Sequence, residues 1–444
     1  FFCHLFFLFS PLSKEKEKDF LYICKFDARR MEFPRPSKEG SQSLPQRTKQ
    51  QHMRNYKLWN NIIGWAVWLI ASIVFIGTAE RAASWWDCGE YISSASQLMV
   101  GHPPGAPTFQ LLGAIASIFA FGDPAKAGFM VNCMSALCSS FTILFLFWSI
   151  TMLARKLVFR FNYTTHDAKT KRRILLPDAP DASSWIPSLA QSILIFGSGI
   201  VGALAYTFSD SFWFSAVEGE VYAMSSFFTA VTFWAILRWE TVADQPHNLR
   251  WIILIAFMIG LAIGVHLLNL LVIPAIVFVI YYKKFQPSRK RFWISMLLSV
   301  LILGLTLWVI IPWTVKLAGY IELFCVNSLG MPFNIGTILF FIILIAALVF
   351  GLRYAQKHQR VILHTSLLCL CFLLIGYSTF ITLVIRANAN VPLNQGEVKN
   401  AISLLSYLNR DQYGSTPLVY GQFYNAQLIE VEEANPQYVR DDST

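Results

Sequence analysis

The sequence contains little charge for its length. Only 14% of its 444 residues are Asp, Glu, Lys or Arg, whereas soluble domains carry about 25%. So few charged side chains cannot cover a globule of this size with a polar surface. A soluble enzyme is therefore excluded. No basic soluble domain is visible either, so the net charge of +10 does not indicate binding to nucleic acid.

Other patterns are also missing. The apolar and polar residues do not alternate as they would in a membrane β-barrel. The eight cysteines lack the spacing of metal ligands, and those inside apolar runs are expected to be small buried residues. We find no internal repeat and no inverted symmetry between the two halves, which weakens a transporter interpretation.

Long apolar runs dominate the sequence, which is 55% hydrophobic with a mean hydropathy of +0.48. Crossing a hydrocarbon core takes about 20 apolar helical residues. Several runs without any Asp, Glu, Lys or Arg reach that length: 58–79, 128–154, 182–209, 292–315 and 361–385. The sequence therefore predicts an all-α polytopic membrane protein.

Basic residues indicate which loops face the cytoplasm, because Lys and Arg concentrate there. They gather in 155–173, 283–291, 353–360 and the loop between Arg238 and Arg250. Three segments lie between these loops: 80–127, 209–220 and 316–334. Their only basic residues are Arg81, Lys126 and Lys316. We expect the first group inside and the second group outside.

Two apolar segments need special placement if this charge pattern is to hold. The run 106–121 is 16 residues long and bounded by prolines, so we expect an interfacial or re-entrant helix in the first outer loop. The run 251–282 lies between two basic loops and must cross twice, with an outer turn at Gly264 to His266. Nine crossings result: 59–79, 128–154, 186–208, 221–238, 251–265, 267–282, 292–315, 335–352 and 361–384.

The chain divides into three parts by composition. We interpret residues 1–52 as a disordered leader that is not native, with Met53 as the natural start; a functional cytosolic tail is the alternative. Residues 53–385 form the transmembrane domain. Residues 386–444 are polar, and we expect them to be the start of a truncated outer soluble region.

The expected outer face gathers unusual polar residues. Asp87 and Glu90 lie three residues apart, so they share one face of a helical turn, and tryptophans flank them. Carboxylates at a membrane surface are costly unless paired or solvated, which makes them site candidates. A solvated loop with an aromatic interface belt is the alternative. His102, in a His-Pro-Pro-Gly turn, is either a site residue or a packing residue.

Further candidates lie in the other outer segments. Asp210, Trp213 and Glu220 belong to a carboxylate-rich stretch in which Glu220 could simply cap a helix. His266 could be a polar plug in a helix break, and Arg386 a snorkelling anchor after the last helix. Their convergence on one face favours a site.

At these residues the sequence resembles a known family. Trp86-Asp87-Cys88-Gly89-Glu90 and the run from Gly101 to Pro107 resemble the paired D-x-G-E and H-P-P-G-x-P motifs of domain of unknown function 2723. That family is associated with protein O-mannosyltransferases of the C-type glycosyltransferase superfamily, and this version is closest to its Bacteroidota branch. Trp213, Glu220, His266 and the segment after Arg386 also match.

The resemblance implies a membrane glycosyltransferase. Such an enzyme moves a sugar, here expected to be mannose, from a polyprenyl-phosphate carrier to Ser or Thr hydroxyls of an exported acceptor protein. Asp87 would be the general base, with Glu90 and Glu220 as further catalytic residues. The expected substrate-binding residues are His102, Asp210, Trp213, His266 and Arg386.

The resemblance also implies a location in the cell. The protein would lie in the inner (plasma) membrane, in contact with membrane lipid, with its active site on the periplasmic side. No metal ligand is assigned, although a divalent metal is a candidate cofactor. A transporter or flippase of lipid-linked sugars, or a non-catalytic envelope assembly protein, remains as the alternative function.

Overall fold

The computed structural model describes residues 46–166, 173–182, 184–414, 419–421, 423–427, 438 and 441. The chain divides into two units, residues 1–52 and 53–444, and the description below concerns the second. The expected leader therefore lies outside the described residues, except for 46–52, which are helical. Most of the polar region after residue 414 also lies outside them.

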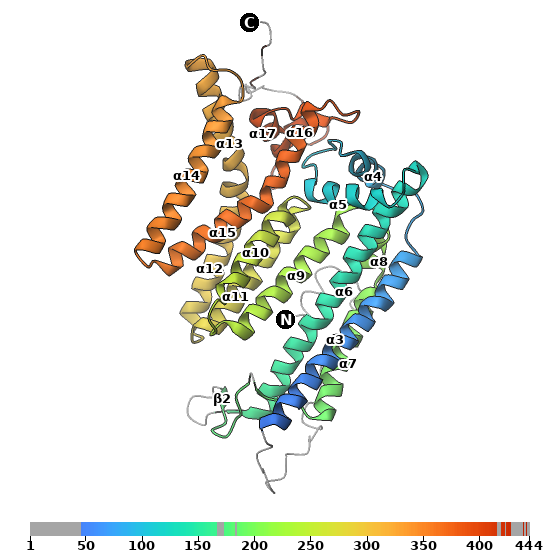
Figure 1. Cartoon of the computed structure of the whole chain (residues 1–444), viewed down its shortest axis with the longest axis vertical. Coiled ribbons are helices and arrows are strands. Elements are labelled where there is room, and N and C mark those ends of the chain that lie inside the picture. Colours follow the sequence, from blue (N-terminus) through green and yellow to red (C-terminus); the bar gives the residue numbers. More distant parts are fainter. Residues whose placement is uncertain are drawn as a thin grey trace. The chain divides into compact units, whose positions relative to one another are not determined.

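Long helices account for most of the described chain (Figure 1). They are α3 (Gln46–Gly77), α6 (Pro124–Tyr163), α7 (Leu189–Thr207), α9 (Val221–Val242), α10 (Leu249–Ile263), α11 (Ile273–Lys284), α12 (Arg289–Leu305), α13 (Ile311–Leu323), α14 (Ile335–Lys357), α15 (Val361–Tyr377) and α16 (Ile381–Asn388). Short 3-10 or π-helical segments extend them: η1 (Leu267–Val272), η2 (Thr306–Ile310), η3 (Phe324–Ser328) and η4 (Ser378–Phe380).

Short elements connect these helices. They are α4 (Cys88–Gln97), α5 (Pro107–Ile118), α8 (Asp210–Ala216), η5 (Gln395–Glu397), α17 (Ala401–Asn409) and η6 (Asp411–Tyr413), with one antiparallel hairpin of β1 (Thr164–His166) and β2 (Arg173–Leu175). In Figure 1, α4, α5, α16 and α17 lie at one end of the bundle and the hairpin lies at the other.

The prediction of an all-α polytopic membrane protein is confirmed. Among the described residues, eight helical segments are long and apolar enough to cross a membrane. Eight of the nine expected crossings fall on these segments. The ninth, 251–265, corresponds to α10, which has 15 residues and therefore spans only about 22 Å.

The segment 316–334, expected on the outer side, is helical over most of its length, and its placement outside stays a prediction. The helical segment that contains the predicted span 292–315 runs without a break from Arg289 to Ser328. Pro312 has no N–H to donate, and the π-helical turn η2 just before it accommodates that missing hydrogen bond. The extended helix also carries buried Glu322, whose carboxylate accepts hydrogen bonds from the backbone N–H groups of Asn334 (2.5 Å) and Thr337 (2.8 Å) at the start of α14.

The short apolar run after the first span forms α5, as expected. Its 12 residues span about 18 Å, too little to cross a hydrocarbon core of about 30 Å. Pro107 begins the helix, and Gly122, with φ of +82°, turns the chain toward α6. The Asp123 side chain then caps α6 by accepting from the Ala125 N–H at 3.0 Å.

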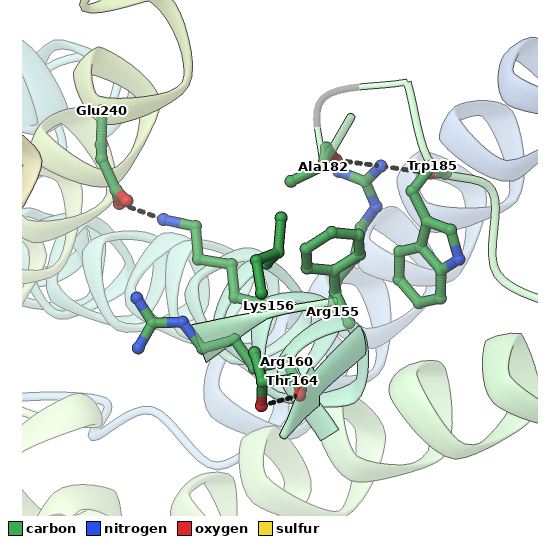
Figure 2. A pocket seen from close by; sticks show the side chains of 9 residues that line it. Arg155, Lys156, Arg160, Thr164, Ala182, Trp185 and Glu240 are labelled. Carbon is green, nitrogen blue, oxygen red and sulfur yellow. Dashed lines mark hydrogen bonds and ion pairs between the residues drawn. The ribbon is translucent and has the colours of Figure 1, made fainter. Parts of the chain in front are cut away.

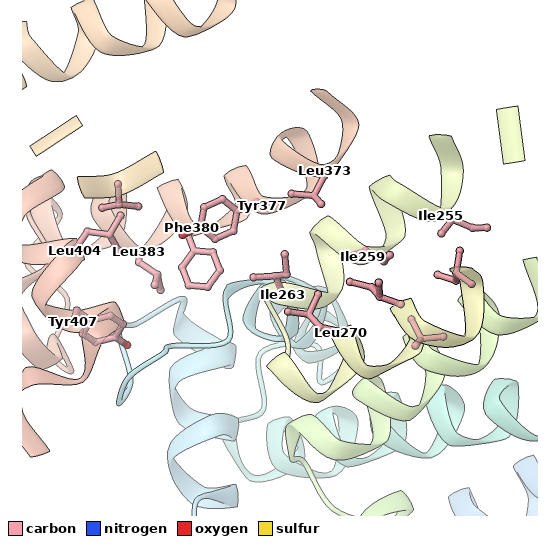
Figure 3. Packing of buried hydrophobic residues seen from close by; sticks show 14 of the residues in the cluster. Ile255, Ile259, Ile263, Leu270, Leu373, Tyr377, Phe380, Leu383, Leu404 and Tyr407 are labelled. Carbon is pink, nitrogen blue, oxygen red and sulfur yellow. The ribbon is translucent and has the colours of Figure 1, made fainter. Parts of the chain in front are cut away.

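One large apolar core joins the second half of the bundle to the short helices near its end (Figure 3). Ile255, Ile259 and Ile263 of α10 face Leu373, Tyr377 and Phe380 of the last long segment, and the cluster continues to α17. Helices α10 and α15 approach each other closely where Gly260 meets Gly376. A Cβ atom at Gly260 would lie 2.2 Å from the Leu373 carbonyl oxygen, so only glycine fits there.

The segment after the last long helix packs back onto the first loop. Val100 donates to the Leu393 carbonyl and accepts from the Gln395 N–H, each at 3.0 Å. The Tyr407 hydroxyl of α17 donates to the Gly101 carbonyl at 2.5 Å. This part of residues 386–444 therefore belongs to the wall of the first loop.

Candidate functional site

Helix α4 carries the first carboxylates. The chain enters it through Trp86, whose φ of +63° lies in the left-handed region, and Asp87 is the N-cap residue. The Asp87 side chain makes no capping hydrogen bond, so its carboxylate remains available for other groups. The flanking residues Trp85 and Trp86 are 85% and 88% exposed, so their rings do not shield Asp87 from water.

Glu90 and His102 join the two halves of the sequence motif. One Glu90 carboxylate oxygen, Oε1, accepts from the His102 backbone N–H at 2.5 Å and lies 3.2 Å from His102 Nδ1. The Gln395 side-chain amide donates to the same oxygen at 3.4 Å. A Cβ atom at Gly101 would lie 2.6 Å from this oxygen, which explains the glycine.

The His102 ring also reaches Asp87. Its second nitrogen, Nε2, lies 3.8 Å from Asp87 Oδ2, and the Asp87 side chain is 56% exposed. His102 therefore lies between two carboxylates, and a proton on Nδ1 would be held by Glu90. This arrangement orients the ring toward Asp87, as a carboxylate does in other acid–base sites.

The segment 209–220, which was expected on the outer side, brings two more carboxylates to this place. Glu218 is buried, and its Oε2 accepts from the Ser84 hydroxyl at 2.6 Å. Glu220 is the N-cap residue of α9, but its side chain makes no capping hydrogen bond. Burial, followed by the negative charges of Glu218 and Asp87, raises the pKa of Glu220 to about 7. Glu220 can therefore gain or lose a proton near neutral pH.

A thiol lies beside these carboxylates. Cys88 Sγ and one carboxylate oxygen each from Glu218 and Glu220 lie within 4.8 Å of one another. Burial is the main reason that the pKa of Cys88 is raised to about 12, so the thiol is neutral at physiological pH. A thiol with two carboxylates is a donor set that could hold a divalent cation, so the expected candidate metal fits these residues.

Helix α6 holds the two loops together through a buried amide. Asn132 donates through Nδ2 to the carbonyl oxygens of Glu80 (2.7 Å) and Ala82 (2.9 Å). Its Oδ1 faces the turn between the two glutamates, since a Cβ atom at Gly219 would lie 2.8 Å from it. This amide therefore sets the spacing of the loops that carry the carboxylates.

His266 lies next to this group at the helix break where it was expected. Its Nδ1 accepts from the Leu268 N–H at 3.2 Å, and its ring centroid lies 5.4 Å from that of Tyr222, two residues after Glu220. Burial lowers the pKa of His266, which favours the neutral ring.

Arg386 fastens α16 to α4. Its Nε donates to the Leu98 carbonyl at 2.6 Å, and a terminal nitrogen donates to the Gln97 carbonyl at 3.1 Å. These bonds satisfy carbonyl groups at the carboxyl end of α4, where a cation also favours the helix dipole. The expected role of Arg386 in substrate binding stays a prediction.

Two expected site residues lie apart from this group. Asp210 is exposed in the first turn of α8. Trp213 donates to the Thr78 hydroxyl at 3.1 Å and packs against Phe75 of α3. Neither makes a contact with Asp87, Glu90 or Glu220 in the described part of the chain.

Comparisons with known proteins place this region in context. The family described as "Protein O-mannosyl-transferase TMEM260 N-terminal domain" matches residues 87–289. The chain resembles an O-mannosyltransferase-like family. A protein O-mannosyl-transferase tmem260 from Dictyostelium discoideum is 24% identical over 247 residues, which cover 53% of this chain and 25% of that relative. Protein O-mannosyl-transferase TMEM260 from Mus musculus is 24% identical over 218 residues, 48% of this chain and 25% of that relative. No solved structure matches.

The matched family segment begins at Asp87 and includes every proposed site residue except Arg386. The chain spans about a quarter of the length of these curated relatives. The prediction of an O-mannosyltransferase-like family is supported at this level. The finer assignment to domain of unknown function 2723 and to its Bacteroidota branch stays a prediction.

The structure gathers four predicted residues, Asp87, Glu90, His102 and Glu220, and places His266 beside them. Sequence reasoning missed the contributions of Cys88, Glu218 and Asn132. Cys88 stands inside the motif, and Glu218 stands two residues before Glu220, so both could have been noticed. Asn132 lies inside an apolar run, and its position there is the only signal that it serves a polar contact.

Proposed function

We propose that this chain contains the membrane domain of a glycosyltransferase that moves mannose from a polyprenyl-phosphate carrier to Ser or Thr hydroxyls of exported proteins. The chain of contacts from Glu90 through His102 to Asp87 is the observation that carries this proposal. It lies at the end of a helical bundle that could hold a prenyl chain. The similarity to proteins named protein O-mannosyl-transferase supports the same reaction class.

The proposed reaction is a displacement at the anomeric carbon of the sugar. Asp87 accepts the proton of the acceptor hydroxyl while that oxygen forms a bond to the sugar. The bond between the sugar and the phosphate breaks, and the polyprenyl phosphate leaves with the electron pair. His102, oriented by Glu90, holds the Asp87 carboxylate in place, and its nitrogen can share the accepted proton.

The other residues have supporting roles in this proposal. Glu220, with its pKa near 7, shapes the charge of the site and can exchange a proton at neutral pH. His266 binds the sugar or the phosphate as a neutral ring, and Arg386 stabilises the departing phosphate. The distribution of basic loops supports a site on the outer, periplasmic side of the plasma membrane.

The decisive experiment is the substitution Asp87→Asn. This change keeps the shape of the side chain and removes its basicity, so sugar transfer should fall by about 10²- to 10⁴-fold. Transfer is measured by mass spectrometry of an acceptor peptide incubated with purified protein and polyprenyl-phosphate mannose. Donor binding and expression should change little.

Asp123→Asn provides the matched control, because Asp123 caps α6 near the same end of the bundle without joining the carboxylate group. It should transfer sugar normally. Near-normal transfer by Asp87→Asn, together with loss in Glu220→Gln, would move the base to Glu220. Activity in Asp87→Asn, Glu90→Gln and Glu220→Gln alike would refute a glycosyltransferase site here.

A further inference from the structure

A cavity of about 530 Å³ lies at the opposite end of α6 from the carboxylates (Figure 2). Its walls come from the last turns of α6, the β1–β2 hairpin, the segment before α7 and the end of α9. The lining residues are Arg155, Lys156, Phe159, Arg160, Thr164, Leu175, Ala182, Trp185 and Glu240. Nothing in the proposed transfer reaction uses this cavity.

The cavity stands at the level where the chain leaves the apolar layer. The charge-free run of α6 ends immediately before Arg155, and α7, the next apolar helix, begins at Leu189. Aromatic rings collect here, with the Phe159 centroid 5.5 Å from Trp185 and 5.2 Å from Tyr163. Such rings are enriched at the boundary between a membrane and water.

The cavity has an excess of positive charge. Lys156 is paired with Glu240 on one side, as Figure 2 shows. Arg155 turns to the other side, where a terminal nitrogen donates to the carbonyl oxygens of Ala182 (3.3 Å) and Trp185 (2.5 Å). Its guanidinium also lies over the rings of Tyr56 (5.9 Å) and Trp185 (5.8 Å), but no carboxylate among the described residues forms an ion pair with it.

One buried donor in the cavity lacks an acceptor, and a second guanidinium, which is exposed, lines the same cavity. The Arg155 Nε atom is buried and has no hydrogen-bond partner. The Arg160 guanidinium makes no hydrogen bond or ion pair within the described residues, although Arg160 lines the same cavity. A buried N–H without an acceptor is costly, and guanidinium groups bind phosphate oxygens in a planar, two-pronged geometry. A phosphate would supply an acceptor for Arg155 Nε and a counter-charge for both guanidinium groups.

We propose that this cavity binds the phosphate headgroup of an anionic phospholipid in the leaflet at the basic end of the bundle. A lipid fits better than a soluble phosphate because the apolar wall of Phe159 and Leu175 adjoins the cationic groups at the membrane boundary. The exposed apolar side chain of Leu157 on the same helix would face the acyl chains. Basic pockets of this kind between membrane helices bind lipid headgroups in other proteins.

The test uses the full-length protein in nanodiscs of phosphatidylcholine, with and without phosphatidylglycerol. Phosphatidylglycerol should raise the melting temperature and remain bound in native mass spectrometry after detergent release. Arg160→Gln should weaken its retention by about tenfold, as expected for the loss of one charge-assisted hydrogen bond. Arg160→Lys should restore part of the retention. Arg160 is preferred over Arg155 because its side chain holds no loop in place.

Lys290→Gln is the charge-matched control, since Lys290 is an exposed cation in the first turn of α12, away from the cavity. It should retain phosphatidylglycerol like the unaltered protein. Equal retention by Arg160→Gln and Lys290→Gln would overturn the proposal, as would equal stabilisation by both lipid compositions. Stabilisation by inorganic phosphate without retained lipid would also overturn it, because the occupant would then be a free anion.

Discussion

At the scale of single residues, the site depends on carboxylates in unlike surroundings. Asp87 is exposed beside His102, whereas Glu218 is buried and bound by Ser84. Glu220 is half-buried near both negative charges, and this position raises its pKa. Carboxylates within one small group therefore differ in exposure and hydrogen bonding, and Glu220 also has a raised pKa.

Glu220 makes stability depend on pH in a predictable direction. Its pKa rises from 4.5 in the unfolded chain to about 7 in the folded protein, so the folded state keeps a proton that the unfolded state releases. The free energy of unfolding therefore falls as pH rises through this window. In chelator-treated protein, Glu220→Gln should be more stable than the unaltered protein at pH 8 by about 1 kcal/mol, allowing for the half-exposure of the carboxylate.

Thermal unfolding at pH 5 and pH 8 measures this difference. The advantage of Glu220→Gln should shrink toward pH 5, where Glu220 is already protonated in the folded state. Glu397→Gln, a change at an exposed glutamate, should show no such pH dependence. A Glu220→Gln variant with the same advantage at both pH values would show that packing, not ionisation, is responsible.

At the scale of elements, a few close contacts decide how the helices meet. Arg386 joins α16 to the end of α4, and Gly260 and Gly376 bring α10 and α15 into contact. Small residues serve this purpose in membrane bundles, where packing replaces the hydrophobic effect between helices.

Substitution of Arg386 tests whether its guanidinium binds the phosphate of the sugar donor in addition to the carbonyl groups at the end of α4. If its guanidinium also contacts the lipid phosphate, Arg386→Ala should weaken binding of polyprenyl-phosphate mannose by about tenfold or more, as a charge-assisted bond is lost. Arg386→Lys should restore only part, because an ammonium lacks the planar fork. Binding is measured by equilibrium titration. Arg410→Ala, at the exposed arginine that ends α17, is the control. If Arg386→Ala binds the donor with unchanged affinity, the role of Arg386 is only to bind the carbonyl groups at the end of α4.

Gly260→Ala tests the contact between α10 and α15. The added methyl group would meet the Leu373 carbonyl at 2.2 Å, so the helices must separate. We expect a loss of about 1–3 kcal/mol in stability, seen as a lower melting temperature in detergent. Gly197→Ala in α7 is the matched control, because no atom lies within 4 Å of its added Cβ. Equal melting temperatures for the two variants would contradict this packing.

At the scale of the whole molecule, the two ends of the bundle differ in chemistry. Carboxylates and His102 gather at the α4–α5 end, and Arg155, Lys156 and Arg160 line the cavity at the hairpin end. Figure 1 shows these two ends of the bundle opposite each other. A multi-pass membrane protein with this division has its two faces in different compartments.

The orientation can be measured at Ala125, which is exposed near the start of α6. A membrane-impermeant thiol reagent should label Ala125→Cys in intact cells, because the distribution of basic loops predicts that this end lies outside. Leu175→Cys, at the exposed hairpin end, should be labelled only after the membrane is opened. The reverse pattern would refute the assigned orientation.

The sequence by itself determined the class of the protein and the positions of most helices. Helix formation in lipid depends on local features, because a run of apolar residues must satisfy its own backbone hydrogen bonds. The short α5 and the helix break at His266 were readable for the same reason, whereas the paired motif halves were found through their resemblance to a known family. The extension of the helix through residues 316–328 was not, since those residues mix polar and apolar side chains.

Only the tertiary structure decided which side chains meet. Arg386 binds a carbonyl 288 residues away, and Gln395 reaches Glu90 across 305 residues. Cys88 joins Glu218 and Glu220 from the start of α4. The pKa of Glu220 is raised by its burial and by the charges of Glu218 and Asp87. Such contacts depend on how helices pack against one another, and packing depends on shape and burial summed over the bundle rather than on any local pattern of residues.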